Sequence, residues 1–348
     1  MPVTIVDVAR HAGVSKSTVS LVMNDSPLIR EATKEKVRRS IEELGYVPNF
    51  AARNLSTAKT SMIGIVIACE NRSPVMTPYF RKGTYVFSHD ISEGISTGLA
   101  SERYGIVTEY HYCSPNVATL PEMVAERKVD GVILIGTRYN DTVMRRVFES
   151  GMPAVAVGHY YDYMDSVYVN MERGAYIPTE RVILGGTKVL LYLNCPPHYH
   201  SHAQREAGFF AACRAHPDPD RQELTYSCEM NSGQGGYDAI AALWEQGVRP
   251  DAVVAANETI ALGAMRFFDE KGLRIPDDVS IAGYESSLLG EYSSPPLTSV
   301  AIGKHYMGES AVQMLLARIE NPEMPPQSIR IEPRLVERAT VRPISEES

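Results

Sequence analysis

The segment Thr4-Ile-Val-Asp-Val-Ala-Arg-His-Ala-Gly-Val-Ser-Lys-Ser-Thr-Val-Ser-Leu-Val-Met-Asn24 decides the fold at the start of this 348-residue chain. Thr4 with Asp7 three residues later has the pattern of a capping box, and apolar side chains then recur at helical spacing. Gly13 supplies the backbone freedom that a sharp turn needs, and Ser15 can cap a second helix. The segment therefore predicts a helix-turn-helix, the motif whose second helix enters the major groove of DNA.

A third helix is expected over residues 31–44, because apolar side chains such as Val37 recur along one side and Gly45 supplies a stop. The Lys and Arg side chains of this helix, Lys34 among them, are expected on its outer faces. The three helices together predict an all-α DNA-binding domain over residues 1–47.

Residues 48–60 are expected to join this head to a larger body. The stretch Gly45-Tyr-Val-Pro-Asn-Phe-Ala-Ala-Arg-Asn-Leu55 is typical of a short hinge helix. Isolated helices shorter than about 12 residues are marginal in water, so the folding of this one must be coupled to a partner. A plain interdomain linker is the alternative interpretation.

The charge is unevenly distributed along the chain. The net charge of −8 would argue against a nucleic-acid partner for the whole molecule. Residues 1–59, however, carry nine Lys and Arg against six Asp and Glu, whereas the remainder carries 25 against 36. A basic head on an acidic body fits a DNA contact that is confined to one end.

Neither a membrane span nor a disulfide framework is expected. No apolar run approaches the roughly 18 residues that a membrane helix needs, and the N-terminus lacks the pattern of a signal peptide. The five cysteines are scattered without a Cys-x-x-Cys pair, which is typical of free thiols in a reducing cytoplasm.

Beyond the linker, short apolar strands alternate with amphipathic helices. Strands are expected at residues 62–68, 105–110, 131–135, 154–157, 188–193, 252–255, 279–282 and 299–302. Helices are expected at residues 89–103, 120–126, 141–150, 173–184, 202–215, 236–246, 258–271 and 304–319. This alternation predicts doubly wound parallel sheets, and its length favours two lobes with a ligand cleft between them.

The chain resembles the LacI/GalR family of bacterial repressors over essentially its whole length. The resemblance rests on Thr-Ile-x-Asp-Val-Ala-x-x-Ala-Gly-Val-Ser in the head, on Leu44-Gly-Tyr-x-Pro-Asn49 and on Ala52-Arg-x-Leu55. Weaker marks follow in the expected order: Asp130-Gly-Val-Ile, Arg205-x-x-Gly-Phe, Ala256-Asn-Glu-x-x-Ala-Leu-Gly, Ala282-Gly-Tyr-Glu285 and Arg334-Leu-Val-x-Arg338.

The resemblance implies a cytoplasmic, nucleoid-associated homodimer on a near-palindromic DNA operator. It also implies a periplasmic-binding-protein-like body over residues 61–348 with a small effector, often a sugar, between its lobes. The first lobe is expected at about 61–163 and 296–322, and the second at about 164–295 and 323–344. The sequence shows no leucine heptad near the C-terminus, so a tetramer is not expected.

For the DNA contact, the resemblance implies that one set of side chains faces base edges and another faces phosphates. The base-facing set is Lys16, Ser17 and Leu21; the phosphate-facing set is Ser15, Thr18 and Asn24. Many relatives have Arg where this chain has Leu21, so an operator position with relaxed or thymine preference is expected there. In the hinge the expected DNA-binding residues are Asn49, Arg53 and Leu55, with Leu55 as a wedge in the minor groove.

For the effector, five side chains are candidates. They are Ser201, Arg205, Tyr237, Asn257 and Glu285. An Arg fork suits vicinal hydroxyls or a carboxylate, a Tyr ring can stack on a sugar, and Glu285 stands where relatives usually have Asp. Each could instead make a structural hydrogen bond or pack in the core.

Two further segments depart from the family pattern. The 70–88 connection is long and carries Tyr and Arg side chains, so it is a candidate for reshaping the effector pocket. The alternating His198, His200 and His202 could bind zinc, but no Cys or carboxylate partner lies alongside. A pocket loop that offers imidazoles to a polar ligand is the favoured interpretation, so neither a metal nor a cofactor is expected. Gly233-Gln-Gly-Gly236 is interpreted as a turn.

Three rival functions are weighed. A sugar-binding protein without gene control would lack the head. An enzyme would show a phosphate loop, a nucleophile elbow or a His-Glu-x-x-His motif, and none is present. A regulator with a nucleobase or nucleoside effector is not excluded by the sequence.

Overall fold

The computed structural model describes residues 3–23, 25–46, 59–69, 84–112, 119–136, 141–197 and 201–344. The chain divides into two compact units, residues 1–60 and residues 61–348. Several predictions lie outside the described residues: the roles of Asn24 and of the hinge residues Asn49, Arg53 and Leu55, most of the 70–88 connection, and His198 with His200.

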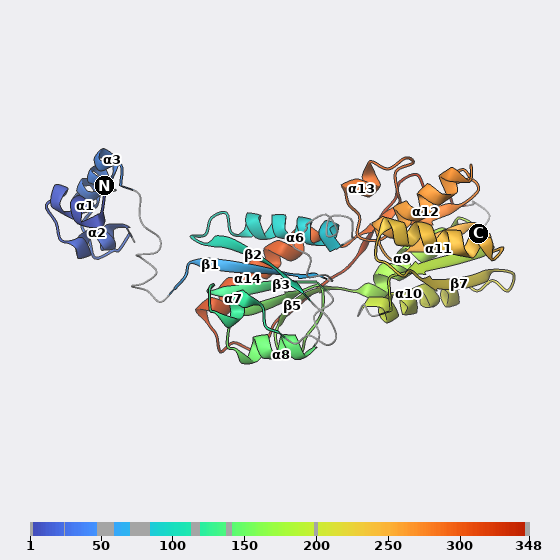
Figure 1. Ribbon diagram of the computed structural model, residues 1–348, viewed down its shortest axis with the longest axis horizontal. Helices are drawn as coiled ribbons and strands as arrows, with labels where there is room; N and C mark the ends of the chain where they lie inside the picture. Colours follow the sequence, from blue (N-terminus) through green and yellow to red (C-terminus); the bar gives the residue numbers. More distant parts are fainter. Residues whose placement is uncertain are drawn as a thin grey trace. The chain divides into compact units, whose positions relative to one another are not determined.

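The first unit contains the three predicted helices: α1 (Ile5–His11), α2 (Lys16–Met23) and α3 (Glu31–Leu44) (Figure 1). The capping box is present, because the Asp7 amide donates to Thr4 Oγ1 at 3.4 Å and the Thr4 amide donates to Asp7 Oδ2 at 3.0 Å. Gly45 ends α3 in the left-handed region, at φ 59°. Val8, Val19 and Val37, one from each helix, are fully buried in the shared core.

The first lobe of the body is built on a six-stranded sheet with the order β11-β5-β4-β3-β1-β2, in which every neighbouring pair is parallel. Its strands are β1 (Met62–Cys69), β2 (Gly105–Tyr112), β3 (Gly131–Ile135), β4 (Ala154–Val157), β5 (Asp165–Val169) and β11 (Ser328–Ile331).

Helices cover both faces of this sheet. One face packs against α6 (Thr84–Gly98) and α14 (Lys304–Glu320), and the other against α7 (Glu122–Ala125) and α8 (Asp141–Glu149) (Figure 1). Alternate β1 residues enter the two cores, with Ile65 on the α6 side and Val66 on the α7 side. This is the doubly wound arrangement that continuous apolar strands predict.

The second lobe has a four-stranded parallel sheet with the order β7-β6-β8-β9. Its strands are β6 (Val189–Asn194), β7 (Gln222–Ser227), β8 (Ala252–Ala255) and β9 (Ser280–Ala282). Helices α9 (Met171–Leu184) and α10 (Ser201–Ala215) pack together, as do α11 (Gly233–Glu245) and α12 (Glu258–Glu270). A short helix, α13 (Leu288–Glu291), follows β9.

The chain passes between the two lobes three times. It crosses after β5 into α9, after β9 through β10 (Ser299–Ala301), and after β11 through β12 (Arg334–Val336). β10 and β12 pair with each other in an antiparallel ladder. The last passage reaches the second lobe where the Ile281 amide donates to the Thr340 carbonyl at 2.7 Å.

The predicted lobe boundaries are wrong at two strands. Residues 164–169 and 328–331 were assigned to the second lobe, but β5 pairs with β4 and β11 pairs with β5 in the sheet of the first lobe. The physical reason is that the chain crosses only after β5, so the crossing lies at Asn170, the N-cap of α9. β11 then completes the edge of the sheet beside β5.

Two local predictions also change. Gly233–Gly236, interpreted above as a separate turn, is instead the first turn of helix α11, which Ser232 caps. Its glycines allow close contact between helices, since a Cβ on Gly236 would meet the Ile260 carbonyl oxygen at 2.1 Å. The helix expected at 89–103 instead spans Thr84–Gly98. Among the described helices, none combines the length and apolarity needed to cross a membrane.

Candidate effector site and DNA-reading surface

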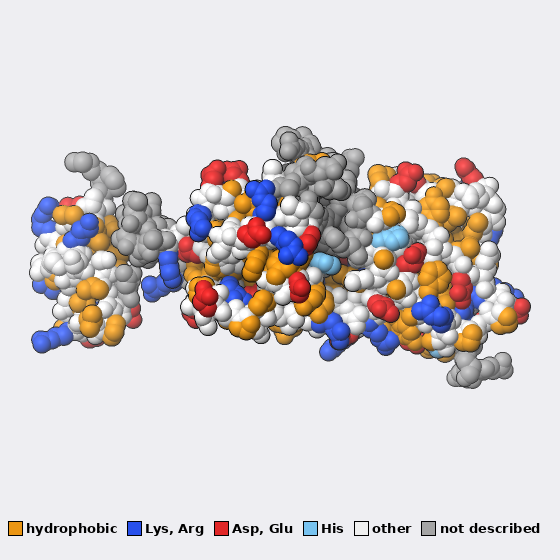
Figure 2. Space-filling view, turned by 90° about the horizontal axis from the view of Figure 1, so that it is seen from below, with side chains coloured by type: hydrophobic (Ala, Val, Ile, Leu, Met, Phe, Trp, Pro, Cys, Tyr) orange, Lys and Arg blue, Asp and Glu red, His pale blue; other side chains and the backbone are white. Residues whose placement is uncertain are grey.

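The second helix of the head presents polar side chains outward. Ser15, Lys16, Ser17 and Leu21 are exposed, Leu21 by 38%, whereas Val19 and Val22 are buried. The Thr18 amide donates to Ser15 Oγ at 3.0 Å and the two hydroxyls lie 2.9 Å apart, so Ser15 and Thr18 fix the start of α2. The outward set is the one expected to face DNA, and Figure 2 shows Lys and Arg side chains on the surface of the head.

One basic residue of α3 is placed differently from the expectation. Lys34 is buried, and its ammonium lies 2.9 Å from Asp25 Oδ1, which Arg38 also reaches at 3.1 Å. Asp25 follows α2 at a φ of 49°. Lys34 therefore ties the segment after α2 to α3 and does not lie on an outer face of the helix.

In the body, the structure brings Arg205 and Glu285 together. Arg205 lies in α10 and Glu285 follows β9; their side chains are 6% and 14% exposed. Arg205 Nη2 donates to Glu285 Oε1 at 3.3 Å, and the guanidinium carbon lies 4.4 Å from the centroid of the Tyr284 ring. Arg205 Nε, although buried, has no hydrogen-bond partner within the described residues. An unmet buried donor of a charged group is costly and indicates a missing ligand or water.

The backbone and the local charges both set Glu285 apart. Its φ of 81° lies in the left-handed region, which non-glycine residues rarely adopt and which is found at functional sites. Burial raises the pKa of the Glu285 carboxyl, and the charges of Arg205 and Lys304 oppose that rise. The carboxylate is therefore held in a desolvated position where a hydroxyl or amide donor would stabilise its ionised form.

A second buried carboxylate stands beside this pair. Burial raises the pKa of Glu258, and its Oε2 accepts a hydrogen bond from Ser287 Oγ at 2.5 Å. Lys304, at the start of α14 in the first lobe, is buried and lies 2.6 Å from Asp90 Oδ2 of α6. Charged groups from both lobes thus converge where the chain crosses between them.

Ser201 and Asn257 have structural partners of their own. Ser201 is buried at the start of α10, with its Oγ 4.0 Å from Cys195 Sγ. Asn257 caps α12, because its Oδ1 accepts from the Ile260 amide at 2.9 Å and from Thr259 Oγ1 at 2.8 Å, and its Nδ2 donates to Asn231. The capping role competes with the expected contact between Asn257 and an effector.

Tyr237 is not brought to the Arg205–Glu285 pair. Its hydroxyl donates to Glu270 Oε2 at 2.6 Å and its ring packs against Phe267 at 5.4 Å, both on α12. The expectation that this ring stacks on a sugar therefore loses its geometric support. His202, of the alternating histidines, has its Nε2 2.9 Å from Ser227 Oγ. Within the described ranges, no three His, Cys, Asp or Glu side chains are grouped to hold a metal ion.

A cavity of about 380 Å³ that was not predicted from the sequence lies between the lobes. His159 and Tyr160 line it from the end of β4, Tyr168 from β5 and Arg330 from β11, while Ser201 and Gln204 line it from α10. The aromatic run His159-Tyr-Tyr-Asp-Tyr163, one residue after the apolar strand β4, was the available signal. Such a position at the carboxyl end of a parallel strand is where α/β folds bind ligands.

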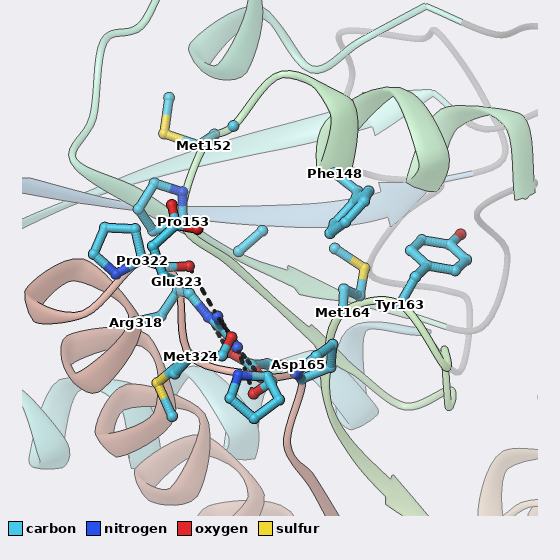
Figure 3. A pocket seen from close by; sticks show the side chains of 14 residues that line it. Phe148, Met152, Pro153, Tyr163, Met164, Asp165, Arg318, Pro322, Glu323 and Met324 are labelled. Carbon is cyan, nitrogen blue, oxygen red and sulfur yellow. Dashed lines mark hydrogen bonds and ion pairs between the residues drawn. The ribbon is translucent and has the colours of Figure 1, made fainter.

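A different cavity, of about 340 Å³, lies at the opposite ends of the first-lobe strands (Figure 3). Its polar centre is the Arg318–Asp165 ion pair, with Nη2 to Oδ1 at 2.8 Å and Nε to Oδ2 at 2.9 Å. Arg318 also donates to the carbonyls of Pro322, Met324 and Pro325. These contacts satisfy the buried charges and fasten the loop after α14 to β5, which is a structural role.

Comparisons with known proteins agree with this architecture. Residues 4–49 match the family described as bacterial regulatory proteins, lacI family, and residues 183–341 match the periplasmic binding protein-like domain. The HTH-type transcriptional repressor PurR of Yersinia pestis is 31% identical over 344 residues, which are 97% of this chain and 96% of that protein. PurR of Yersinia pseudotuberculosis matches to the same extent.

Solved structures show the same fold. The lac repressor dimer bound to operator and the anti-inducer ONPF superposes with a TM-score of 0.79 at 24% identity, over 99% of this chain and all of that one. The transcriptional regulator CelR in complex with cellobiose gives a TM-score of 0.67 at 27% identity, over 97% and 99% of the two chains. With the helix-turn-helix head and the two-lobed body described above, these matches show that the chain belongs to the lacI family of DNA-binding bacterial transcriptional regulators.

Proposed function

We propose that this regulator is a repressor that binds a near-palindromic operator as a homodimer and is switched by a small sugar bound beside Arg205 and Glu285. The observation that carries the effector site is the buried Arg205 guanidinium, whose Nε has no partner among the described residues. It stands at the carboxyl side of the second-lobe sheet, where such folds bind ligands. A planar guanidinium fork and a carboxylate together match a pair of vicinal hydroxyls.

Repression is supported by the relatives' names. The PurR relatives are named transcriptional repressors, and the lac repressor was solved on its operator. In this chain, Lys16, Ser17 and Leu21 would read base edges from α2, and Ser15 and Thr18 would stay near phosphates.

The remaining DNA contacts belong to the stretch outside the described residues. Asn24 would contact phosphate, and Asn49, Arg53 and Leu55 would enter or border the minor groove when the hinge folds on DNA. Leu55→Ala is the direct test of the wedge: a loss of operator affinity supports it, and wild-type affinity leaves the stretch as a plain linker.

A second copy of the chain is the proposed occupant of two exposed apolar surfaces. On and beside α13, Leu288 is 68% exposed and Tyr292 79% exposed; on β2, Ile106 and Tyr110 are 37% and 46% exposed. Exposed apolar side chains gathered on one element mark interaction sites, and the lac repressor was solved as a dimer. Sedimentation of the full chain should give a dimer, which Leu288→Glu with Tyr292→Glu should weaken.

A sugar is favoured as the effector because the CelR relative holds cellobiose, and a further family member from Enterococcus faecium holds ribose. A nucleobase or nucleoside is the second candidate, since the tyrosines near the cavity could stack on a base. A sugar-binding protein without gene control is disfavoured by the head. An enzymatic function is not proposed, because the relatives are regulators.

Closure of the lobes on the effector would transmit the signal. Lys304 and Asp90 stand in the first lobe next to Glu285 and Glu258, so a ligand that moves Glu285 changes the charges that surround α6 and α14. A marginal hinge needs only a few kcal/mol of differential binding to switch between ordered and disordered states. Whether the sugar releases or strengthens DNA binding depends on which state it prefers.

The test is a thermal-shift screen of the full chain against sugars, nucleobases and nucleosides, followed by operator titration with and without each hit. A sugar should raise the melting temperature and change operator affinity, and Arg205→Ala should abolish both effects. Arg266→Ala is the matched control, because Arg266 is an exposed arginine of α12. A nucleobase hit without any sugar hit, or equal operator affinity at saturating sugar, would overturn the proposal.

A further inference from the structure

The cavity between the lobes is distinct from the Arg205–Glu285 pair but touches it at two points. Ser201 lines the cavity and lies one helical turn before Arg205 on α10, a separation of about 5–6 Å between Cβ atoms. Met171 also lines the cavity, and its Sδ accepts from Tyr284 Oη at 3.4 Å, under the Arg205 guanidinium. The cavity therefore borders the Arg205–Glu285 pair through Ser201 and Met171, at the same interface between the lobes.

The cavity offers an aromatic platform. Tyr160 is 46% exposed and its ring packs on Tyr168 with centroids 5.2 Å apart and planes at 49°. Within the described residues, neither hydroxyl has a hydrogen-bond partner. A ring held on one side and open on the other is suited to contact the apolar face of a sugar ring, while its hydroxyl bonds a polar edge.

The cavity is also lined by polar side chains that can hydrogen-bond a ligand, and its positive and negative charges balance. The exposed Gln204 amide makes no hydrogen bond to the described part of the chain. The Arg330 side chain, which is 58% exposed, pairs with Glu332 at 3.0 Å between Nε and Oε1, so its guanidinium lies within reach of a ligand in the cavity. Glu172, which also lines the cavity, and Glu332 offset Arg330, so the lining favours a neutral polyhydroxyl over an anion.

We propose that this cavity is a second sugar subsite, so that the effector is a neutral disaccharide or longer saccharide. Its first ring lies beside Arg205 and Glu285, and its second ring stacks on Tyr160 and bonds Gln204 and Arg330. The cavity volume of about 380 Å³ falls within the size of ligand sites, roughly 300–1,000 Å³. This inference rests on the proposed function, and it specifies in addition that the sugar effector has at least two rings.

The test compares monosaccharides with disaccharides by isothermal titration of the full chain. The probes are glucose with cellobiose and maltose, and galactose with lactose and melibiose. At least one disaccharide should bind ten-fold or more tightly than its monosaccharide. Tyr160→Ala should reduce that disaccharide affinity about five- to ten-fold while changing monosaccharide affinity less than two-fold.

Three variants complete the design. Gln204→Ala should act in the same direction as Tyr160→Ala, and Tyr160→Phe should retain most of the affinity because the platform persists. Tyr306→Ala, at a tyrosine that is 56% exposed on α14 and does not line the cavity, is the matched control. Unchanged melting temperatures confirm that each variant folds.

The two proposals fail in different ways. If monosaccharides bind as tightly as disaccharides, or if Tyr160→Ala and Gln204→Ala leave disaccharide affinity unchanged, the second subsite is wrong and the sugar effector stands. If Arg205→Ala leaves all sugar affinities unchanged, the proposed effector site itself is wrong. If none of the sugars binds and a nucleobase does, both proposals are overturned.

Discussion

Replacing Arg205 by Met tests how strongly the effector site is desolvated. Methionine fills a similar volume without charge, so the substitution removes the cation from Glu285 with little loss of packing. The Arg205 side chain is 6% exposed and its Nη2 lies 3.3 Å from Glu285 Oε1. Breaking a buried pair by removing one partner costs about 3–5 kcal/mol of unfolding free energy.

The loss of unfolding free energy caused by Arg205→Met has an upper limit that depends on pH. Without Arg205, Glu285 can avoid being buried as an anion by taking up a proton. From an unfolded pKa of about 4.3, at 1.36 kcal/mol per pKa unit, protonation costs ~5 kcal/mol near pH 8 but only ~1.6 kcal/mol near pH 5.5. We therefore expect a loss of about 3–5 kcal/mol near pH 8 and less than ~2 kcal/mol near pH 5.5.

The direction of the pH dependence of stability follows from the direction of the Glu285 pKa shift. Burial already raises the pKa of Glu285 in the folded protein, and removal of Arg205 raises it further. The folded variant then binds more protons than the unfolded chain, so its stability falls as pH rises above the unfolded pKa. The wild type should show a weaker dependence of the same sign from this residue, because Arg205 opposes the shift.

The assay is urea unfolding followed by the fluorescence of Trp244, the one tryptophan of the sequence. Trp244 packs against the hydrophobic core of the second lobe, which also holds α10, so it reports the lobe that contains Arg205. Arg266→Met, at an exposed position of α12, should leave the transition unchanged. Glu285→Gln added to Arg205→Met should recover most of the loss. A cost below ~1 kcal/mol that does not change with pH would refute the description of a desolvated pair.

Three further substitutions test other parts of the molecule. Asp165→Asn should lower the unfolding free energy of the first lobe by about 3 kcal/mol in urea unfolding followed by far-UV circular dichroism, since it leaves the largely buried Arg318 without its carboxylate. Asp162→Asn, at an exposed neighbouring aspartate, is the control, and an equal effect of both substitutions would contradict the structural role of the ion pair. Thr4→Ala should lower the unfolding free energy of the head by about 1 kcal/mol and speed hydrogen exchange of the α1 amides about five-fold, because it removes the helix cap. Exchange at the wild-type rate would show that the cap does not stabilise the helix. Leu21→Ala should change base preference at one operator position in a binding-site selection without altering the melting temperature, because Leu21 is already 38% exposed; unchanged preference at every position would remove Leu21 from the reading set.

Strands that consist only of buried apolar residues were predictable from the sequence. β3 and β4 consist of buried apolar residues throughout, and both were expected at their observed bounds. β7 and β11 were missed because each is an edge strand of exposed and half-buried residues, so neither forms an apolar run. β5 begins with Asp165, whose buried carboxylate is paired with Arg318, and a charged residue conceals a buried strand from pattern analysis.

The candidate site was predictable only where the family motif marks a residue. Arg205 and Glu285 stand 80 positions apart, and the structure brings them to one point. Tyr237 shows the limit of the motif, because its helix turns the ring toward α12. The cavity escaped detection because its lining needs β11, which comes about 160 residues after Tyr168 along the chain and yet lies next to β5.

The edge position of β11 also bears on how the protein is made. The first lobe begins at β1, but its sheet is completed only by residues 328–331, and one of its two cores requires α14. A ribosome therefore has to deliver nearly the entire polypeptide before the first lobe of the body can assemble. Nascent chains should hold apolar strands such as β1 and β3 unprotected for most of translation, which makes this regulator a natural client for chaperones that shield emerging hydrophobic segments.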